Sequence, residues 1–95
     1  MTRMDVVGRS QDLVFAEVDG EAVALSAALG TCYGLDGIGL RVLQLIEPPA
    51  TIDEICRRLE AEYDVDQQTC ETDTINLLTE LEIEGLVVVE QGKPA

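Results

Sequence analysis

The stretch from Asp66 to Val89, DQQTCETDTINLLTELEIEGLVVV, constrains the fold of this 95-residue chain more than any other. Asp66 can cap a helix, and small or apolar side chains then recur at helical spacing as far as Leu81. Gly85 can end this helix with a positive φ angle, and a β-prone run from Leu86 to Glu90 follows at once. We therefore expect a long helix around which the rest of the chain is organised.

Three strands are expected before this helix. Alternation predicts strands at 13–18 and 21–26, joined by Asp19-Gly20, a dipeptide suited to the positive φ angles of a type I′ turn. After a turn of small residues, 31–35 is expected as a third, short strand. Its alternate side chains should form two faces, with Thr31, Tyr33 and Leu35 on one and Cys32 and Gly34 on the other.

Two further helices are expected between the strands and the long helix. Asp36 can cap a helix from about Gly37 to Glu47, which Pro48-Pro49 stops. The run Thr51–Glu54 is a capping box that opens a second helix. The side chains expected to be buried are Ile38, Val42, Leu43 and Ile46 in the first helix, and Ile52, Ile55, Cys56, Leu59 and Tyr63 in the second.

These elements predict a single domain, 1–95, of the α+β class. It should consist of a three-stranded antiparallel N-terminal sheet followed by a three-helix winged helix-turn-helix-like bundle, with loose tails at 1–11 and 91–95. In DNA-binding proteins of this shape the third helix reads the duplex. Here the span from Asp66 to Glu84 contains no Lys, Arg or His and carries six acids. Such a helix would repel DNA, because affinity for phosphates depends on Lys and Arg.

The charge of the whole chain agrees with that exclusion. A net charge of −13, from 19 acids and 6 bases, argues against nucleic acid and anionic membranes as partners and favours a basic partner, although it also serves solubility alone. No apolar run approaches the roughly 20 residues that span a bilayer, and no secretion signal is present. We therefore expect a cytoplasmic protein.

The side chains needed for most catalytic centres are missing. Cys32, Cys56 and Cys70 are widely spaced without a CxxC motif, and the chain has no His, which excludes zinc sets, Cys/His pairs and Ser/His/Asp triads. The carboxylates form no DxD-type loop and adjoin no Gly-rich phosphate cradle. We expect partly buried thiols and a non-catalytic protein without metal or cofactor.

Three groups of residues resemble a known family when they are taken in order. They are DLVFAEVDGEAVALS followed by GTCYGLD, then TIDEICRRLEAEYDVD, and finally the spaced residues Asp73, Leu77, Leu78, Leu81, Gly85, Leu86 and Val87. Together, from about Leu13 to Val89, they resemble the PqqD-like proteins, which are the peptide recognition elements of ribosomal-peptide maturation. Cys70, three residues before Asp73, and the DLVF and GTCYGL strands are most similar to the free-standing leader-binding proteins of lasso-peptide clusters. The founding member, from quinone-cofactor biosynthesis, has a Tyr-Pro-Glu-type second strand and a Trp in its last segment, which this chain lacks.

The resemblance implies a binding site for the leader of a precursor peptide. The leader would add as an antiparallel strand to the edge of the third strand and direct its side chains toward the third helix. Tyr33 would be an aromatic anchor, Leu77 and Leu81 an apolar floor, and the nearby acids a rim for a basic leader residue. The site residues are then Thr31, Cys32, Tyr33, Gly34, Leu35, Asp73, Leu77, Glu80, Leu81 and Glu84.

The implied function is that of an adaptor, which binds a precursor peptide and delivers it to a modifying enzyme, most simply the lasso-peptide leader peptidase. Other readings stay open: a PqqD-type chaperone for another peptide-modifying enzyme such as a radical SAM enzyme, a winged-helix transcriptional regulator, which the acidic third helix disfavours, or a plain protein-interaction domain. For single residues, Tyr33, Leu77 and Leu81 could instead belong to the core, and the acids could form only a solvated face.

Overall fold

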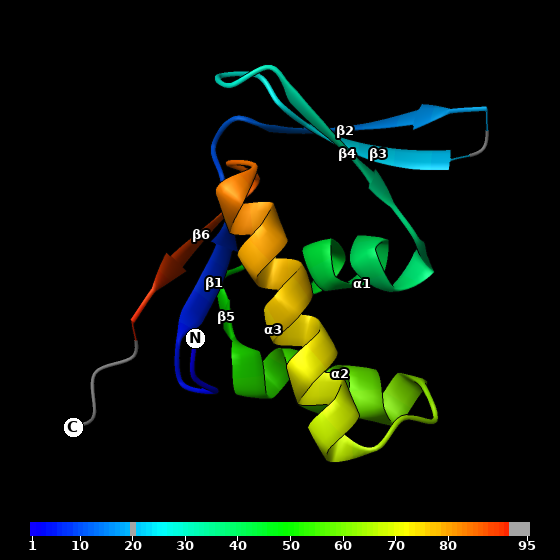
Figure 1. Cartoon of the computed structure of the whole chain (residues 1–95), viewed down its shortest axis with the longest axis vertical. Helices are drawn as coiled ribbons and strands as arrows, with labels where there is room; N and C mark the ends of the chain where they lie inside the picture. The colour runs from blue at the N-terminus through cyan, green and yellow to red at the C-terminus, as the bar shows by residue number, and fades with distance from the viewer. Residues whose placement is uncertain (20, 92–95) are drawn as a thin grey trace.

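The computed structural model describes residues 1–19 and 21–91, in which two small antiparallel sheets surround three helices (Figure 1). The α+β class and the three-helix bundle expected from the sequence are confirmed. Helix α3 crosses the middle of the molecule, with one sheet over its C-terminal end and the other along its flank (Figure 1). In chain order the elements are β1 (Val6–Arg9), β2 (Leu13–Val18), β3 (Glu21–Ser26), β4 (Thr31–Leu35), α1 (Gly37–Leu45), β5 (Ala50–Thr51), α2 (Ile52–Glu62), α3 (Gln67–Ile83) and β6 (Val87–Glu90).

The sheet of β2, β3 and β4 is an antiparallel meander with β3 in the centre. Its register pairs Phe15 with Ala24 and Ala24 with Tyr33, so these three side chains share the face that covers the helices. Asp19 has a φ of 52°, as the expected turn requires, while its neighbour Gly20 lies outside the described residues. Strands β2 and β4 are the edges of this sheet.

The second sheet corrects the prediction for the N-terminus. Residues 1–11 were expected to be loose, but Val6–Arg9 forms the central strand β1, with β5 on one side and β6 on the other. Val7 is fully buried and pairs with Val89. The segment contains no alternating pattern, and its partner strand lies at the other end of the chain, so local sequence gives no signal for it. Of the other expected tail, 91–95, residues 92–95 lie outside the described residues.

The helix boundaries follow the predicted caps. The Asp36 carboxylate accepts a hydrogen bond from the N–H of Gly39 at 2.7 Å, and that of Asp66 accepts one from Thr69 at 2.8 Å. The capping box of Thr51 and Glu54 is present, and Gly85 ends α3 with a φ of 75°. Helix α1 ends at Leu45 rather than Glu47, with Ile46 as its C-cap, so its last turn stops before the two prolines.

The core is aliphatic and lies between α1, α2, α3 and the two sheets. The buried stripe of α3 consists of Cys70, Thr74, Leu78 and Leu81, which leaves Leu77 half-buried beside it. The prediction that Ile38 and Tyr63 are buried is wrong, because Ile38 is 43% exposed and Tyr63 is 37% exposed. Ile38 occupies the first turn of α1 and Tyr63 the C-cap of α2, and at those ends the helices leave the core. None of the described helices is long and apolar enough to cross a bilayer.

Candidate functional site

The edge of β4 offers free main-chain groups. The C=O of Ser26 accepts a hydrogen bond from the N–H of Gly30 at 2.8 Å, so Ser26 directs its main-chain groups toward β4. These directions alternate along an antiparallel ladder, and Ser26 pairs with Thr31. The N–H and C=O groups of Cys32 and Gly34 therefore point away from β3, along the open edge. A Cβ at Gly34 would meet nothing within 4 Å, so this edge is also sterically open.

Two side chains of β4 connect this strand to α3. The Thr31 hydroxyl donates a hydrogen bond to the backbone C=O of Glu84 at 2.7 Å, and the Tyr33 hydroxyl donates one to the Glu80 carboxylate at 2.5 Å. The bond to Glu80, together with partial burial and nearby carboxylates, raises the pKa of the Tyr33 phenol above its usual value of 10. These bonds hold the C-terminal half of α3 alongside β4.

A groove runs along α3, between this helix and the start of α1, and begins beside the end of β4. Its first hollow is lined by Asp36, Ile38, Asp73, Asn76, Leu77 and Glu80. A second hollow shares Ile38 and Asp73 with the first and continues toward the end of α2, where Leu59, Tyr63, Val65, Cys70 and Thr74 complete its lining. We call the two together the β4–α3 groove. Its floor is apolar and its rim is acidic, and none of the described residues that line the two hollows is a Lys or Arg.

The thiols near this groove are poor nucleophiles. Cys70 is 5% exposed, and its Sγ contacts the backbone C=O of Cys56 at 3.8 Å. Burial raises the pKa of the Cys56 thiol to about 11, with a further contribution from Cys70 beside it, so the reactive thiolate is disfavoured. Within the described residues, no group of His, Cys, Asp and Glu side chains is arranged to hold a metal ion. The arrangement suits binding of an extended peptide.

The comparison with known protein families agrees with this geometry. Residues 21–87 match the family described as coenzyme PQQ synthesis protein D, PqqD. The chain belongs to the PqqD family. A search of curated protein sequences finds no match to it.

Two solved structures resemble this PqqD family member along most of its length. One is TbiB1 in complex with the TbiA(beta) leader peptide, which is 34% identical, with a TM-score of 0.74 over 93% of this chain and 99% of that one. The other is a lasso peptide synthetase B1 complexed with the leader peptide, with the same TM-score of 0.74 over 86% of this chain and 96% of that one. At 21% identity, the second supports the fold alone.

The structure places the site residues that were predicted for this PqqD family member on β4 and on α3 and its C-cap. Thr31, Tyr33 and Leu35 face the helices, and Cys32 and Gly34 face solvent, as expected. On α3, Asp73, Leu77 and Glu80 line the groove. The β4 residues border the groove without lining it. Of the other predicted residues, Leu81 is fully buried in the core, and Glu84 lies beyond the groove, where its backbone C=O accepts a hydrogen bond from the Thr31 hydroxyl.

Sequence reasoning missed part of the groove of this PqqD family member. Ile38 and Tyr63 were assigned to the core, yet both line the second hollow, together with Val65, which is 37% exposed. Each stands at a helix end or in the connection between helices, and exposed apolar residues there are a weak sign of a binding surface. Asn76 was also missed, and no pattern in the sequence singles it out.

Proposed function

We propose that this protein binds the leader region of a ribosomally made precursor peptide by strand addition at β4, and delivers it to a modifying enzyme, most simply the lasso-peptide leader peptidase. The observation that carries the proposal is the open main-chain edge of Cys32 and Gly34 beside an apolar groove. A peptide strand at this edge gains main-chain hydrogen bonds, and alternate side chains give specificity. A similar protein, TbiB1, has been solved with a leader peptide.

The groove suggests what such a leader carries. Alternate side chains of an added strand point toward α3, where the two hollows take apolar groups between Ile38, Leu77 and Tyr63. The carboxylates of Asp73 and Glu80 lie at the rim, where a Lys or Arg of the leader would be attracted. We therefore expect a leader with apolar residues at alternate positions and at least one basic residue near them.

The protein acts in this proposal as an adaptor without catalysis of its own. The high pKa of Cys56 and the absence of His support that role. A variant with Cys32, Cys56 and Cys70 all changed to Ala should still bind leader and support processing, with a modest loss of stability from the two buried positions. A folded, leader-binding triple variant that fails to support processing would reveal thiol chemistry.

A second candidate function uses the same leader-binding site but delivers the peptide to a different enzyme. The PqqD family match covers the chain from β3 to β6, which supports a chaperone role for another peptide-modifying enzyme, such as a radical SAM enzyme. A transcriptional regulator is disfavoured, because the exposed charged residues of α3 are all acidic.

Reconstituted processing tests the proposal. The precursor peptide and the leader peptidase of the same gene cluster are incubated with and without this protein, and cleavage is followed by mass spectrometry. We expect the protein to accelerate cleavage and, when incubated alone with precursor, to cleave nothing. Leader binding without acceleration of the peptidase would favour the second candidate, and no leader binding at all would overturn both.

A further inference from the structure

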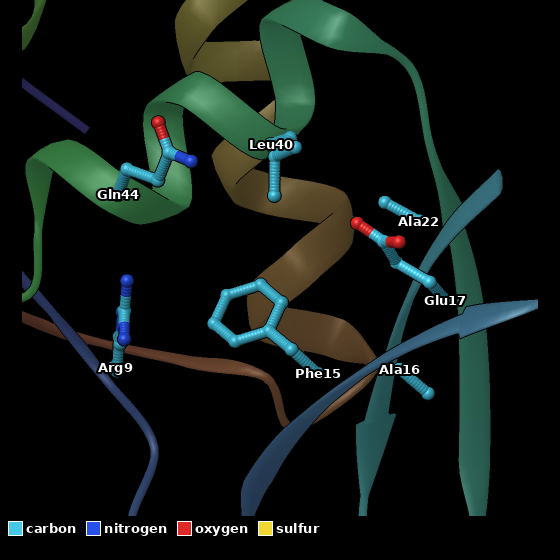
Figure 2. A pocket seen from close by; sticks show the side chains of 7 residues that line it. All are labelled: Arg9, Phe15, Ala16, Glu17, Ala22, Leu40 and Gln44. Carbon is cyan, nitrogen blue, oxygen red and sulfur yellow. The ribbon is translucent and has the colours of Figure 1, made fainter. Parts of the chain in front are cut away.

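A separate hollow lies on the same face of the β2–β3–β4 sheet but at its opposite edge from β4, between the β2–β3 hairpin and α1. It has a volume of about 310 Å³ and is lined by Arg9, Phe15, Glu17, Ala22, Leu40 and Gln44. Figure 2 shows the Phe15 ring facing this space, with Leu40 reaching toward it from α1 and Gln44 at its border. The hollow exists because the central strand contributes only alanine to this part of the inner face. Phe15 stays 37% exposed as a result.

Strand β2 beside the hollow is an unprotected edge. The N–H of Ala27 donates to the C=O of Asp12 at 2.9 Å, so Asp12 directs its main-chain groups toward β3. By alternation, the main-chain groups of Phe15 and Glu17 point away from the sheet. Val14 adds an exposed apolar side chain on the outer face, at 48%. Edge strands are usually blunted by Lys, Pro or a bulge, and β2 contains no Lys or Pro and pairs with β3 in unbroken register.

The hollow has a fixed positive end. The Arg9 Nε donates to the backbone C=O of Leu43 at 2.8 Å, and the guanidinium carbon lies 4.8 Å from the centroid of the Phe15 ring. Among the described residues Arg9 forms no ion pair, whereas Arg3 and Arg41 each pair with carboxylates. Arg9 is therefore held in place without a carboxylate partner among the described residues, although the chain has 19 acids. Its remaining N–H groups are available for an incoming carboxylate.

The opposite end of the hollow is negative. Glu17 reaches into the space on the far side of Phe15 from Arg9 in Figure 2. No basic side chain among the described residues forms an ion pair with Glu17, since the ion pairs found there involve Arg3, Arg41 and Arg57. An occupant complementary to the hollow therefore carries an acidic group at the Arg9 end, a large apolar side chain over Phe15 and Leu40, and a basic group at the Glu17 end.

We infer that β2 and this hollow form a second docking surface, which takes a strand-forming segment of the modifying enzyme with that acidic, apolar and basic order. The inference rests on the proposed function, because it assumes that the leader binds at β4. The leader and the enzyme then occupy opposite edges of one sheet and bind at the same time. A second copy of this chain fits the hollow less well, because each copy carries a net charge of −13.

The test separates docking of the enzyme from binding of the leader. Glu17→Lys reverses the charge inside the hollow, and Glu21→Lys is the matched control, because it makes the same change on the neighbouring strand with the side chain on the opposite face of the sheet. Leader affinity is measured with a labelled leader, and processing with the precursor and its leader peptidase. We expect Glu17→Lys to raise the concentration of this protein needed for half-maximal cleavage by about tenfold. Leader affinity should stay within about twofold for both variants, and the control should process normally.

Each other outcome overturns a specific part of the reasoning. Equal processing by the two variants removes the hollow as a docking surface. A loss of leader affinity in Glu17→Lys means that the precursor occupies the hollow. If the wild-type protein sediments as a dimer and Glu17→Lys sediments as a monomer, a second copy of the chain occupies the hollow. Wild-type protein that fails to bind leader overturns the proposed function itself. Phe15→Ser, which removes the aromatic wall without a change of charge, should reproduce the processing defect if the hollow is the docking surface.

Discussion

Replacing Gly34 by Pro tests the central feature of the proposed site, the open main-chain edge of β4. The N–H of Gly34 points away from β3, so proline removes a donor to the leader without removing a hydrogen bond within the domain. The position is exposed, and an added Cβ would meet nothing within 4 Å. We therefore expect Gly34→Pro to fold and to bind the leader more weakly.

The expected loss of leader affinity follows from the number of main-chain hydrogen bonds that the leader makes at the edge of β4. One main-chain hydrogen bond contributes about 0.5–1.5 kcal/mol net. The proline ring also stands in the path of the added strand, so the neighbouring bond at Cys32 is lost with the one at Gly34. Two bonds correspond to about 1–3 kcal/mol, which is a loss of affinity between about fivefold and about 150-fold. Gly34→Ala keeps the N–H and should bind within about threefold of wild type.

Fluorescence anisotropy with a labelled leader gives the affinities, and circular dichroism shows whether each variant is folded. A folded Gly34→Pro variant with unchanged affinity would refute strand addition at β4. If Gly34→Ala lost as much affinity as Gly34→Pro, the effect would come from the added side chain, and the main-chain argument would fail.

Three further variants test the surroundings of that edge. Tyr33→Ala should weaken leader binding by about tenfold to a hundredfold, because it deletes a half-buried aromatic, and a loss below about threefold would make Tyr33 purely structural. The double variant Asp73→Asn, Glu80→Gln should lower leader affinity a few-fold and remove most of the salt dependence of that affinity. The control double variant Glu82→Gln, Glu90→Gln changes acids outside the groove and should do neither. Equal effects of the two would mean that the leader senses only the total charge of the protein. Gly30→Ala and Gly85→Ala should each lower the free energy of unfolding by about 1–2 kcal/mol, because both residues have positive φ. The Leu29 side chain near Gly85 is exposed and can move aside, so thermal melts should show similar losses for the two variants, and an unchanged melting temperature for either would contradict this.

The sequence by itself determined the features that depend on a few neighbouring residues. The caps at Asp36, Thr51 and Asp66 and the positive φ of Gly85 were all predicted, because a cap is a contact between residues about three apart in the chain. The two faces of β4 followed from its alternation in the same way. Those local signals, together with the spaced residues of the last helix, also indicated the family.

Only the tertiary structure decided which distant residues meet. The pairing of β1 with β6 joins the two ends of the chain, and the hydrogen bond from Tyr33 to Glu80 joins residues far apart in sequence. Exposure was decided in the same way: periodicity indicates which face of a helix is apolar, but the packing of other elements determines how far along the helix that face is covered. For this reason Ile38 and Tyr63, apolar and correctly spaced at the ends of their helices, line a groove instead of the core.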